Sequence, residues 1–270
     1  MANKRPVASL WIGERLQYLN QICLKSHVDQ GHPTTLYCTH NVQNLPEGVE
    51  MRPASDIMDV DLELVEATSA SFFSNVFRYK MIQATGAIWV DCDALCHRPF
   101  PDDMDYIFAG HGMIGNLNCG VVAIPQDCAL MDQLLDYYEE LPDYPPWWRK
   151  NQRKKMDKLA TAPGSHASKI YKVERTAFGP QAFTHFARAT GVFEKAMGPD
   201  VLYPVPFQLN DIFYDPHGRV EGWFTERTLS VHLYTNGTKP YWRKNPPLEN
   251  SFADRMSKKI GIDPSLALDS

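Results

Sequence analysis

The first 38 residues carry a pattern that restricts the chain to few fold classes. Residues 6–13, PVASLWIG, are apolar and β-prone enough for a buried strand that ends in glycine. Residues 14–32 repeat apolar side chains at helical spacing, and Gly31 predicts the end of that helix. Residues 34–38, TTLYC, predict a second strand. The order strand, helix, strand favours a parallel sheet with helices on its faces, so we expect an α/β fold.

Further along the chain, the same signals predict more helices and strands. A helix over residues 71–86 has serines available to cap it and Gly86 to end it, and it leads into a strand over 87–90. Further strands are predicted at 106–109, 120–125, 201–207, 222–224 and 230–234, and further helices at 127–141, 179–191 and 248–261. Residues 142–170 are rich in proline, tryptophan and basic side chains, so we expect an exposed excursion there.

Composition argues against several classes of protein. The chain has 270 residues, of which 44% are hydrophobic and 22% charged, which is ordinary for a soluble globular protein. Its net charge of −5 gives no general attraction to nucleic acid. No apolar run approaches the roughly 20 residues that span a bilayer, and the start, MANKRPVASLWIG, lacks an apolar stretch of signal-peptide length. The six cysteines fit no zinc pattern, so we expect reduced thiols in a cytoplasmic protein.

The segment GAIWVDCDALCHRPF, residues 86–100, carries the strongest chemical signal. Asp91 and Asp93 follow a strand-like apolar run, and side chains at i and i+2 of an extended segment point to the same side. Both carboxylates should therefore project from the C-terminal end of a strand, where ligands bind in open α/β sheets. Two close carboxylates repel each other unless a cation such as Mg²⁺ or Mn²⁺ neutralises them. The alternative is an ordinary solvated turn.

Arg78 lies on the helix that precedes this strand. Its planar guanidinium could reach a phosphate or a sugar oxygen in the same cleft. The alternative for Arg78 alone is a charge on the helix surface. Together with the two aspartates, Arg78 completes the pattern S-N-x-x-R-x(7)-G-A-x-x-x-D-x-D between Ser74 and Asp93.

This pattern resembles the DXD sugar-binding region of a glycosyltransferase superfamily. The superfamily includes yeast-type mannosyltransferases, α-1,4-galactosyltransferases, capsular-polysaccharide transferases and the large clostridial glucosylating toxins. Weaker similarities cover residues 9–38, 176–191 and 230–242. The resemblance implies a single GT-A-like, Rossmann-type domain with a mixed, mainly parallel sheet and an irregular C-terminal acceptor region. Residues 1–125 would form the nucleotide-sugar half, and residues 126–270 the acceptor half that also closes the metal site.

The resemblance implies roles for individual residues at the metal. Asp91 would contact the ribose or the water shell of Mn²⁺ or Mg²⁺, and Asp93 would be a direct metal ligand. His232, in the segment SVHLYTNGTKPYW, would complete the metal and diphosphate site from the C-terminal side. That segment departs from the family pattern, because it offers Asn236, Gly237 and Thr238 where the family has Ser-Trp. A buried histidine bonded to a backbone carbonyl is the alternative for His232.

The donor site follows from the same resemblance. Arg78 and Ser74 would line the donor sugar, and Trp11 would stack on the nucleotide base; a core aromatic is the alternative for Trp11. Asn75 stands where the family has an aspartate that hydrogen-bonds the donor sugar, so donor identity stays open. Ala87 likewise replaces a family glycine.

Other residues are weaker candidates. Asp211 is an acidic residue that we expect near the acceptor, unless it is a turn aspartate. His97, Asn116 and Asn118 could approach the donor or acceptor, or could be ordinary loop residues. The basic stretch 147–158 could bind an anionic lipid-linked acceptor or the inner face of the membrane, or it could be a solvated loop.

The expected function is a metal-dependent glycosyltransferase that moves a sugar from a nucleotide diphosphate, with a UDP-sugar favoured, to a glycan or glycolipid acceptor. The resemblance implies retention at the anomeric carbon; the sequence shows no convincing carboxylate nucleophile, which favours departure and attack on one face. Two alternatives stay open. A non-catalytic nucleotide-sugar-binding or scaffold protein is favoured only by Asn75. A D-x-D phosphohydrolase would want threonine or glycine soon after the second aspartate, and DCDALCHRPF offers neither.

Overall fold

A mixed sheet of five strands forms the centre of the computed structural model, which describes residues 4–110, 115–266 and 268. The strand order is β3-β2-β1-β4-β6. The bounds are β1 (Val7–Trp11), β2 (Thr34–Cys38), β3 (Val49–Pro53), β4 (Ile88–Val90) and β6 (Val121–Val122). The first four strands run parallel, and β6 pairs with β4 in the antiparallel sense. The expected α/β class with a mixed, mainly parallel sheet is confirmed.

Local signals in the sequence set the ends of the first helices. Helix α1 (Tyr18–Asp29) is followed by Gly31 in the left-handed conformation. Helix α3 (Ala70–Thr85) begins at Ser69, whose hydroxyl accepts the N–H of Phe72 at 3.1 Å. It ends at Gly86, whose φ of 68° places the chain to enter β4. These caps deliver the chain directly from α3 into the strand that precedes the two aspartates.

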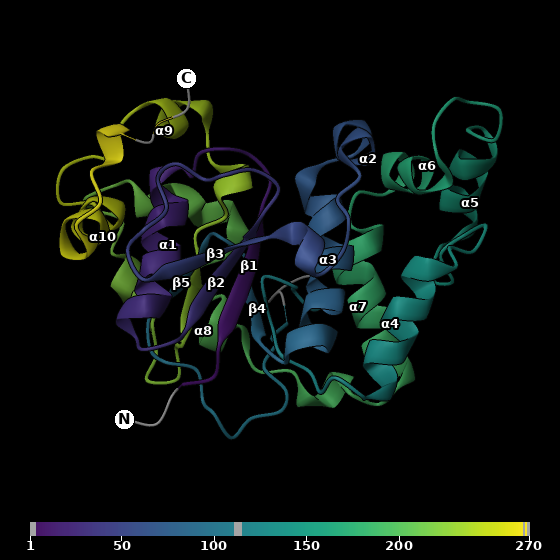
Figure 1. The fold of residues 1–270 in the computed structure, drawn as a ribbon, viewed down its shortest axis with the longest axis horizontal. Helices are drawn as coiled ribbons and strands as arrows, with labels where there is room; N and C mark the ends of the chain where they lie inside the picture. The colour runs from purple at the N-terminus through teal and green to yellow at the C-terminus, as the bar shows by residue number, and fades with distance from the viewer. Residues whose placement is uncertain (1–3, 111–114, 267, 269–270) are drawn as a thin grey trace.

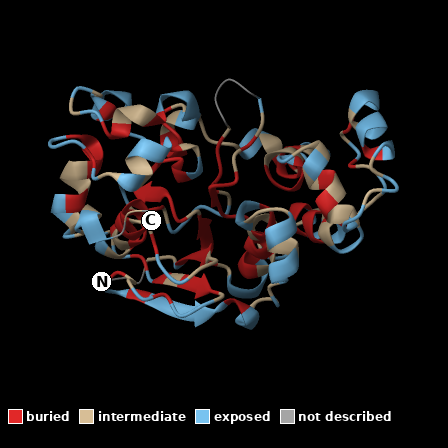
Figure 2. Cartoon of the chain, turned by 90° about the horizontal axis from the view of Figure 1, so that it is seen from above, coloured by how far each residue is buried: buried red, intermediate tan, exposed pale blue. Residues whose placement is uncertain are grey.

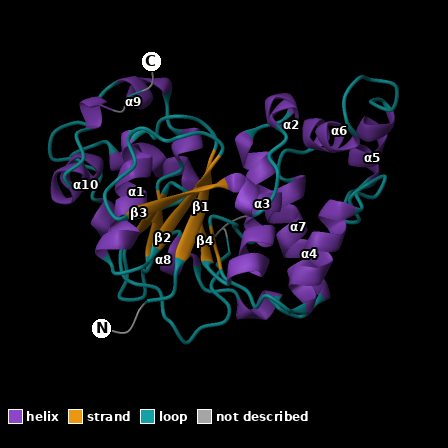
Figure 3. Ribbon diagram, in the orientation of Figure 1, coloured by secondary structure: helices purple, strands orange, loops and turns teal. Residues whose placement is uncertain are grey.

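Helices cover both faces of the sheet (Figures 1 and 3). One face packs against α3, with α4 (Ala129–Glu139) and α7 (Ala182–Ala189) outside it. The other face packs against α1, and α10 (Phe252–Ile260) packs on α1 in turn. The core between these layers is buried, while the outer helix faces are exposed (Figure 2).

The remaining elements are short. The helices are α2 (Leu62–Ala67), α5 (Lys150–Asp157), α6 (His166–Val173), α8 (Pro199–Leu202) and α9 (Pro240–Lys244). Strands β5 (Ala94–Cys96) and β7 (Ser230–His232) form a second, antiparallel sheet of two strands. In the described ranges, no helix combines the length and the apolarity that crossing a bilayer requires.

Three strand predictions are wrong. Residues 199–202 form α8, so 201–207 is not a strand, and 222–224 lies at the end of a 3-10 helix over Val220–Trp223. Residues 106–109 make only isolated bridges. The apolar side chains of 107–109 and 201–205 are largely buried, but a run of apolar residues indicates burial without distinguishing a strand from a helix. Pro204 and Pro206 also lack the N–H that a ladder needs.

The prediction of an exposed excursion at 142–170 is wrong in part. The segment forms α5 and most of α6, and its side chains Trp148, Met156 and Ile170, among others, are buried in the core. Basic side chains occupy its exposed positions. Prolines and charges dominate the sequence of this segment, so the few apolar side chains that anchor it to the core were not recognised.

Candidate functional site

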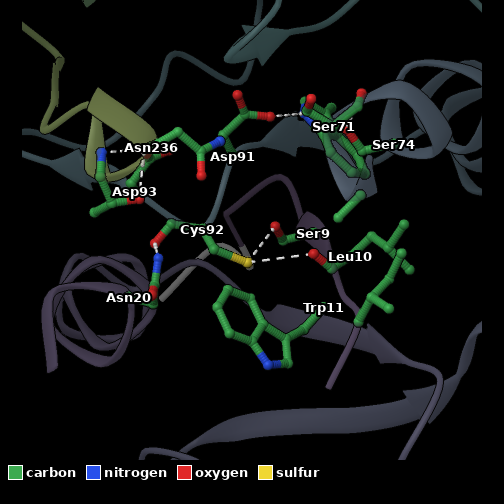
Figure 4. A pocket seen from close by; sticks show the side chains of 14 residues that line it. Ser9, Leu10, Trp11, Asn20, Ser71, Ser74, Asp91, Cys92, Asp93 and Asn236 are labelled. Carbon is green, nitrogen blue, oxygen red and sulfur yellow. Dashed lines mark hydrogen bonds between the residues drawn. The ribbon is translucent and has the colours of Figure 1, made fainter. Parts of the chain in front are cut away.

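The strand order places a pocket where ligands bind in open α/β sheets. From β1 the chain proceeds outward through β2 and β3, then returns to β4 on the other side of β1. Such a reversal opens a crevice beyond the carboxyl ends of the two strands. A pocket of about 210 Å³ lies there, lined by Trp11 at the end of β1, Asp91 after β4, and Ser74 of α3, among others (Figure 4).

Asp91 and Asp93 lie on one turn, and not on an extended segment as expected. The N–H of Ala94 donates to the carbonyl of Asp91 at 2.9 Å, which closes a turn between β4 and β5. The side chain of Asn20, on α1, donates to the carbonyl of Cys92 at 3.3 Å and so ties the turn to that helix. Both carboxylates therefore line the pocket, although the strand geometry that predicted this arrangement is absent.

Each aspartate has one oxygen bound by the protein and one directed into the site. Oδ1 of Asp91 accepts the Nη2–H of Arg78 at 2.9 Å and the Nε1–H of Trp89 at 2.7 Å. Oδ2 of Asp93 accepts the N–H and the hydroxyl of Thr235, at 2.8 and 3.0 Å. The two remaining oxygens, Oδ2 of Asp91 and Oδ1 of Asp93, lie 3.5 and 3.4 Å from Nε2 of His232.

His232 reaches the aspartates because β7 pairs with β5. In the antiparallel register His232 is opposite Ala94, next to Asp93, although about 140 residues separate them in sequence. The three side chains place ligand atoms within 4.8 Å of one another. The ring also packs on Gly120, where a Cβ would lie 2.7 Å from Nε2. Pairing of short strands thus assembles the Asp-Asp-His cluster that the sequence resemblance implied.

The protonation of His232 is coupled to this cluster. Burial lowers the pKa of His232, but the charges of Asp93 and Asp91 outweigh burial and raise it above its ordinary value. Nδ1 accepts the N–H of Tyr234 at 3.2 Å, which leaves the proton of the neutral ring on Nε2, facing the carboxylates. A cation bound at Nε2 would displace that proton, and the contact to Tyr234 would have to open.

Arg78 is buried behind Asp91 and does not line the pocket. Its Nη1–H donates to Oδ1 of Asn75 at 2.8 Å, and its guanidinium lies 4.8 Å from the centre of the Trp89 ring. Burial raises the pKa of Asp91, but the Arg78 charge and the His232 contact outweigh it and hold that pKa well below its ordinary value. Arg78 therefore holds Asp91 ionised and in place.

Asn75 is also engaged within the protein. Its Nδ2 donates to the carbonyl of Ser71 at 2.8 Å, and Gly179 packs so closely that a Cβ there would lie 2.8 Å from Oδ1. Ser74 lines the pocket, with its hydroxyl donating to the same carbonyl at 2.9 Å. Trp11 forms part of the pocket wall, and its Nε1 donates to the carbonyl of Arg15 at 3.1 Å (Figure 4).

The weaker candidates lie in different places. Asp211 forms an ion pair with Lys239 and is absent from the described pocket lining, as is Asn116. His97 lines a separate cavity of about 270 Å³ between α1 and α10. Asn118 is beside the cluster, because its Oδ1 accepts the N–H of Gly120 at 2.8 Å.

Sequence reasoning missed the residues that support the cluster. Trp89 donates to Oδ1 of Asp91, and Thr235 donates to Oδ2 of Asp93. Asn20 fixes the turn, and Gly120 leaves space for the His232 ring. Thr235 follows His232 closely in the quoted closing segment, and Gly120 ends the asparagine-rich stretch GNLNCG. Nothing in their sequence context distinguishes these residues from ordinary turn or core residues.

Comparisons with known proteins add little to this geometry. No family model and no curated protein matches the chain. Among solved structures, the chain is similar to one described as "PaToxG Glycosyltransferase", with a TM-score of 0.43 and 10% sequence identity over 69% of each chain. At this level of similarity we base no argument on the neighbour, so the site rests on its own geometry.

Proposed function

We propose that this chain is a divalent-metal-dependent glycosyltransferase that uses a nucleotide-diphosphate sugar, most naturally a UDP-sugar. The observation that carries the proposal is the convergence of Oδ2 of Asp91, Oδ1 of Asp93 and Nε2 of His232. Both aspartates line a pocket at the strand-order reversal. Retention of configuration, a glycan or glycolipid acceptor, and the division into a donor half (1–125) and an acceptor half (126–270) belong to the same proposal.

The cluster fits a divalent cation. Two carboxylate oxygens and one imidazole nitrogen are turned toward one another, while the opposite oxygen of each aspartate is already hydrogen-bonded. Such pre-oriented ligands need no rearrangement of the aspartates. The mixed donor set suits Mn²⁺ better than Mg²⁺, which prefers oxygen ligands alone. When bound, the ion would act as a Lewis acid that stabilises the charge on the departing diphosphate.

The protein side chains supply binding and orientation. Arg78 and Trp89 fix Asp91, and Thr235 fixes Asp93, so both carboxylates stay aimed at the pocket. Trp11 offers an aromatic wall for the nucleotide base. Ser74 and the Asn236 amide, both in the pocket lining, offer hydrogen-bonding groups to sugar hydroxyls.

The pocket lining also bears on stereochemistry. Among the described residues of the lining, the only carboxylates are Asp91 and Asp93, and both belong to the metal cluster. No further carboxylate is therefore available there as a nucleophile of the kind that retaining glycosidases use. Retention would then require departure and attack on the same face of the sugar. Asp211, which forms an ion pair with Lys239, is proposed to lie near the acceptor.

One observation favours a second candidate, a protein that binds nucleotide sugars without turnover. Asn75 replaces the aspartate of the resembling enzymes, and both ends of its amide are occupied by Ser71 and Arg78. A donor sugar would then lack a carboxylate partner at that position. An enzyme would slowly release nucleoside diphosphate from a bound donor, whereas a binding protein would not.

A thermal-shift panel tests the proposal. Nucleotide sugars with different bases are each added with Mn²⁺, with Mg²⁺ and with a chelator. A ligand at 100 times its Kd adds about 2.7 kcal/mol to the free energy of unfolding, which is an easily measured shift. We expect a stabilisation that requires both a nucleotide sugar and the metal. If no nucleotide sugar stabilises the chain with either metal, the proposed function is wrong.

A further inference from the structure

The segment 149–175, which we call the basic arm, carries charge opposite to that of the rest of the protein. It contains nine basic and two acidic side chains, for a formal net charge of +7 in a chain whose total is −5. All other residues together therefore carry −12. A charge asymmetry of this size within one chain is typical of a surface that binds a polyanion.

The charges of the basic arm lie on one side of α5. Lys150 begins α5, Lys154 lies within it and Lys158 directly follows it. At 100° per residue these three lysines fall within about 80° of one another, with Arg153 beside them. Met156 lies on the opposite side and is buried, at 6% exposure. The helix thus turns an apolar edge inward and presents its ammonium and guanidinium groups to solvent.

No carboxylate within the described residues neutralises the basic arm. None of the nine basic side chains forms an ion pair with an acidic residue of the described chain. Asp157 accepts a hydrogen bond from the Tyr144 hydroxyl, and Glu174 accepts one from Thr176. The positive charge of the arm is therefore available to an external partner.

The basic arm is fixed to the fold beside the candidate site. Directly before the arm, Trp148 is buried and Nε1 of Trp147 donates to Gln181 at 2.8 Å. Within the arm, the ring of Tyr171 on α6 packs edge-on against Phe72 of α3, with the ring centroids 5.9 Å apart. Helix α3 also carries Ser74, which lines the pocket. The arm projects from the molecule next to α2 and α3, and its outer surface is exposed (Figures 1 and 2).

We propose that the basic arm docks this protein on an anionic lipid surface. An outward-facing helix that projects from the fold suits a plane of negative charge, whereas a linear polyanion is usually bound in a groove. In the described part of the arm, no large apolar side chain is exposed for insertion, so attraction to the headgroups supplies the binding. The negative charge of the remaining residues is repelled by the same surface, which orients the arm toward it.

Vesicle sedimentation tests the proposal with the full chain. One vesicle preparation is phosphatidylcholine alone, and the other adds phosphatidylserine at roughly one part in three. The test variant is Lys150→Gln, Lys154→Gln and Lys158→Gln. The control variant is Lys80→Gln, Lys258→Gln and Lys259→Gln, which changes the net charge equally on α3 and α10. Unchanged melting temperatures show that both variants fold.

We expect the wild-type chain to bind only the anionic vesicles and to dissociate at high salt, because salt screens surface charges. Each lysine near the surface contributes about 1 kcal/mol, so the test variant should bind roughly 100-fold more weakly. The affinity of the control variant for the anionic vesicles should lie much closer to that of the wild type. Equal losses in the two variants, or wild-type binding to neutral vesicles, would overturn the proposal.

Duplex DNA at the same concentration of negative charge distinguishes a nucleic acid from a lipid partner. Tighter binding to DNA than to the anionic vesicles would overturn the lipid assignment. The nucleotide-sugar thermal shift of the test variant should equal that of the wild type, because the three lysines lie outside the pocket lining. Failure of the docking proposal can therefore be told apart from failure of the proposed function.

Discussion

Replacing Arg78 by lysine removes the planar group that joins Asp91 to Asn75. The guanidinium makes one charge-assisted hydrogen bond to Asp91 at 2.9 Å and a second to Asn75 at 2.8 Å, over the Trp89 ring. A lysine ammonium at the end of its unbranched chain cannot take the positions of both nitrogens. A lost hydrogen bond to a charged group costs about 1.5–3 kcal/mol, so the free energy of unfolding should fall by about 2 kcal/mol.

The same substitution should weaken the proposed metal site. With Asp91 less firmly held, we expect Mn²⁺ affinity and kcat/KM to fall tenfold or more, which corresponds to about 1.4 kcal/mol. Urea unfolding and calorimetry measure the two effects. The control is Arg175→Lys at an exposed position just after α6, which should change stability by less than about 0.5 kcal/mol. If Arg78→Lys behaves like this control in both assays, Arg78 does not position Asp91.

Two further predictions concern His232. Gly120→Ala would place a methyl group 2.7 Å from Nε2 of His232, so the ring must move. Calorimetry should then show at least tenfold weaker Mn²⁺ binding. Wild-type affinity in this variant would mean that the His232 ring is not a metal ligand. Mn²⁺ affinity should fall as the pH falls, starting above pH 6.5, because the aspartates raise the pKa of His232 above 6.5 and the protonated ring cannot bind metal. In His232→Asn, calorimetry over the same pH range should show little of this decline; a decline equal to that of the wild type would assign it to another group.

The first part of the fold was predictable because its signals are local. Helix α3 has Ser69 before it and Gly86 after it, and both act as the sequence indicates. Strand β3 was missed because it lies at the sheet edge with Glu50 and Arg52 exposed, a pattern that resembles a loop. Strand β5 was missed because three residues are too few for a periodic signal.

The candidate site was predictable in part, namely in its Asp-Asp-His cluster and in Trp11 and Ser74 of the pocket lining. Spacing drew attention to Asp91 and Asp93, and family resemblance pointed to His232, which the β5–β7 pairing does bring to them. The position of Arg78 was not predictable, since a helical arginine can face a ligand or a neighbouring carboxylate with the same sequence pattern. Contacts such as Thr235 to Asp93 join residues far apart in the chain, and only the tertiary fold determines them.

Titration calorimetry of Mn²⁺ and UDP on the wild-type chain and on Asp93→Asn tests the central claim most directly. The amide keeps the size of the side chain and an oxygen for the Thr235 N–H, but it removes the charge proposed to bind the metal. Asp211→Asn, outside the pocket lining, is the matched control. We predict that UDP binds the wild type and the control only when Mn²⁺ is present, and that Asp93→Asn loses this binding. Unchanged, still metal-dependent affinity in Asp93→Asn would contradict the assignment of this cluster as the metal site.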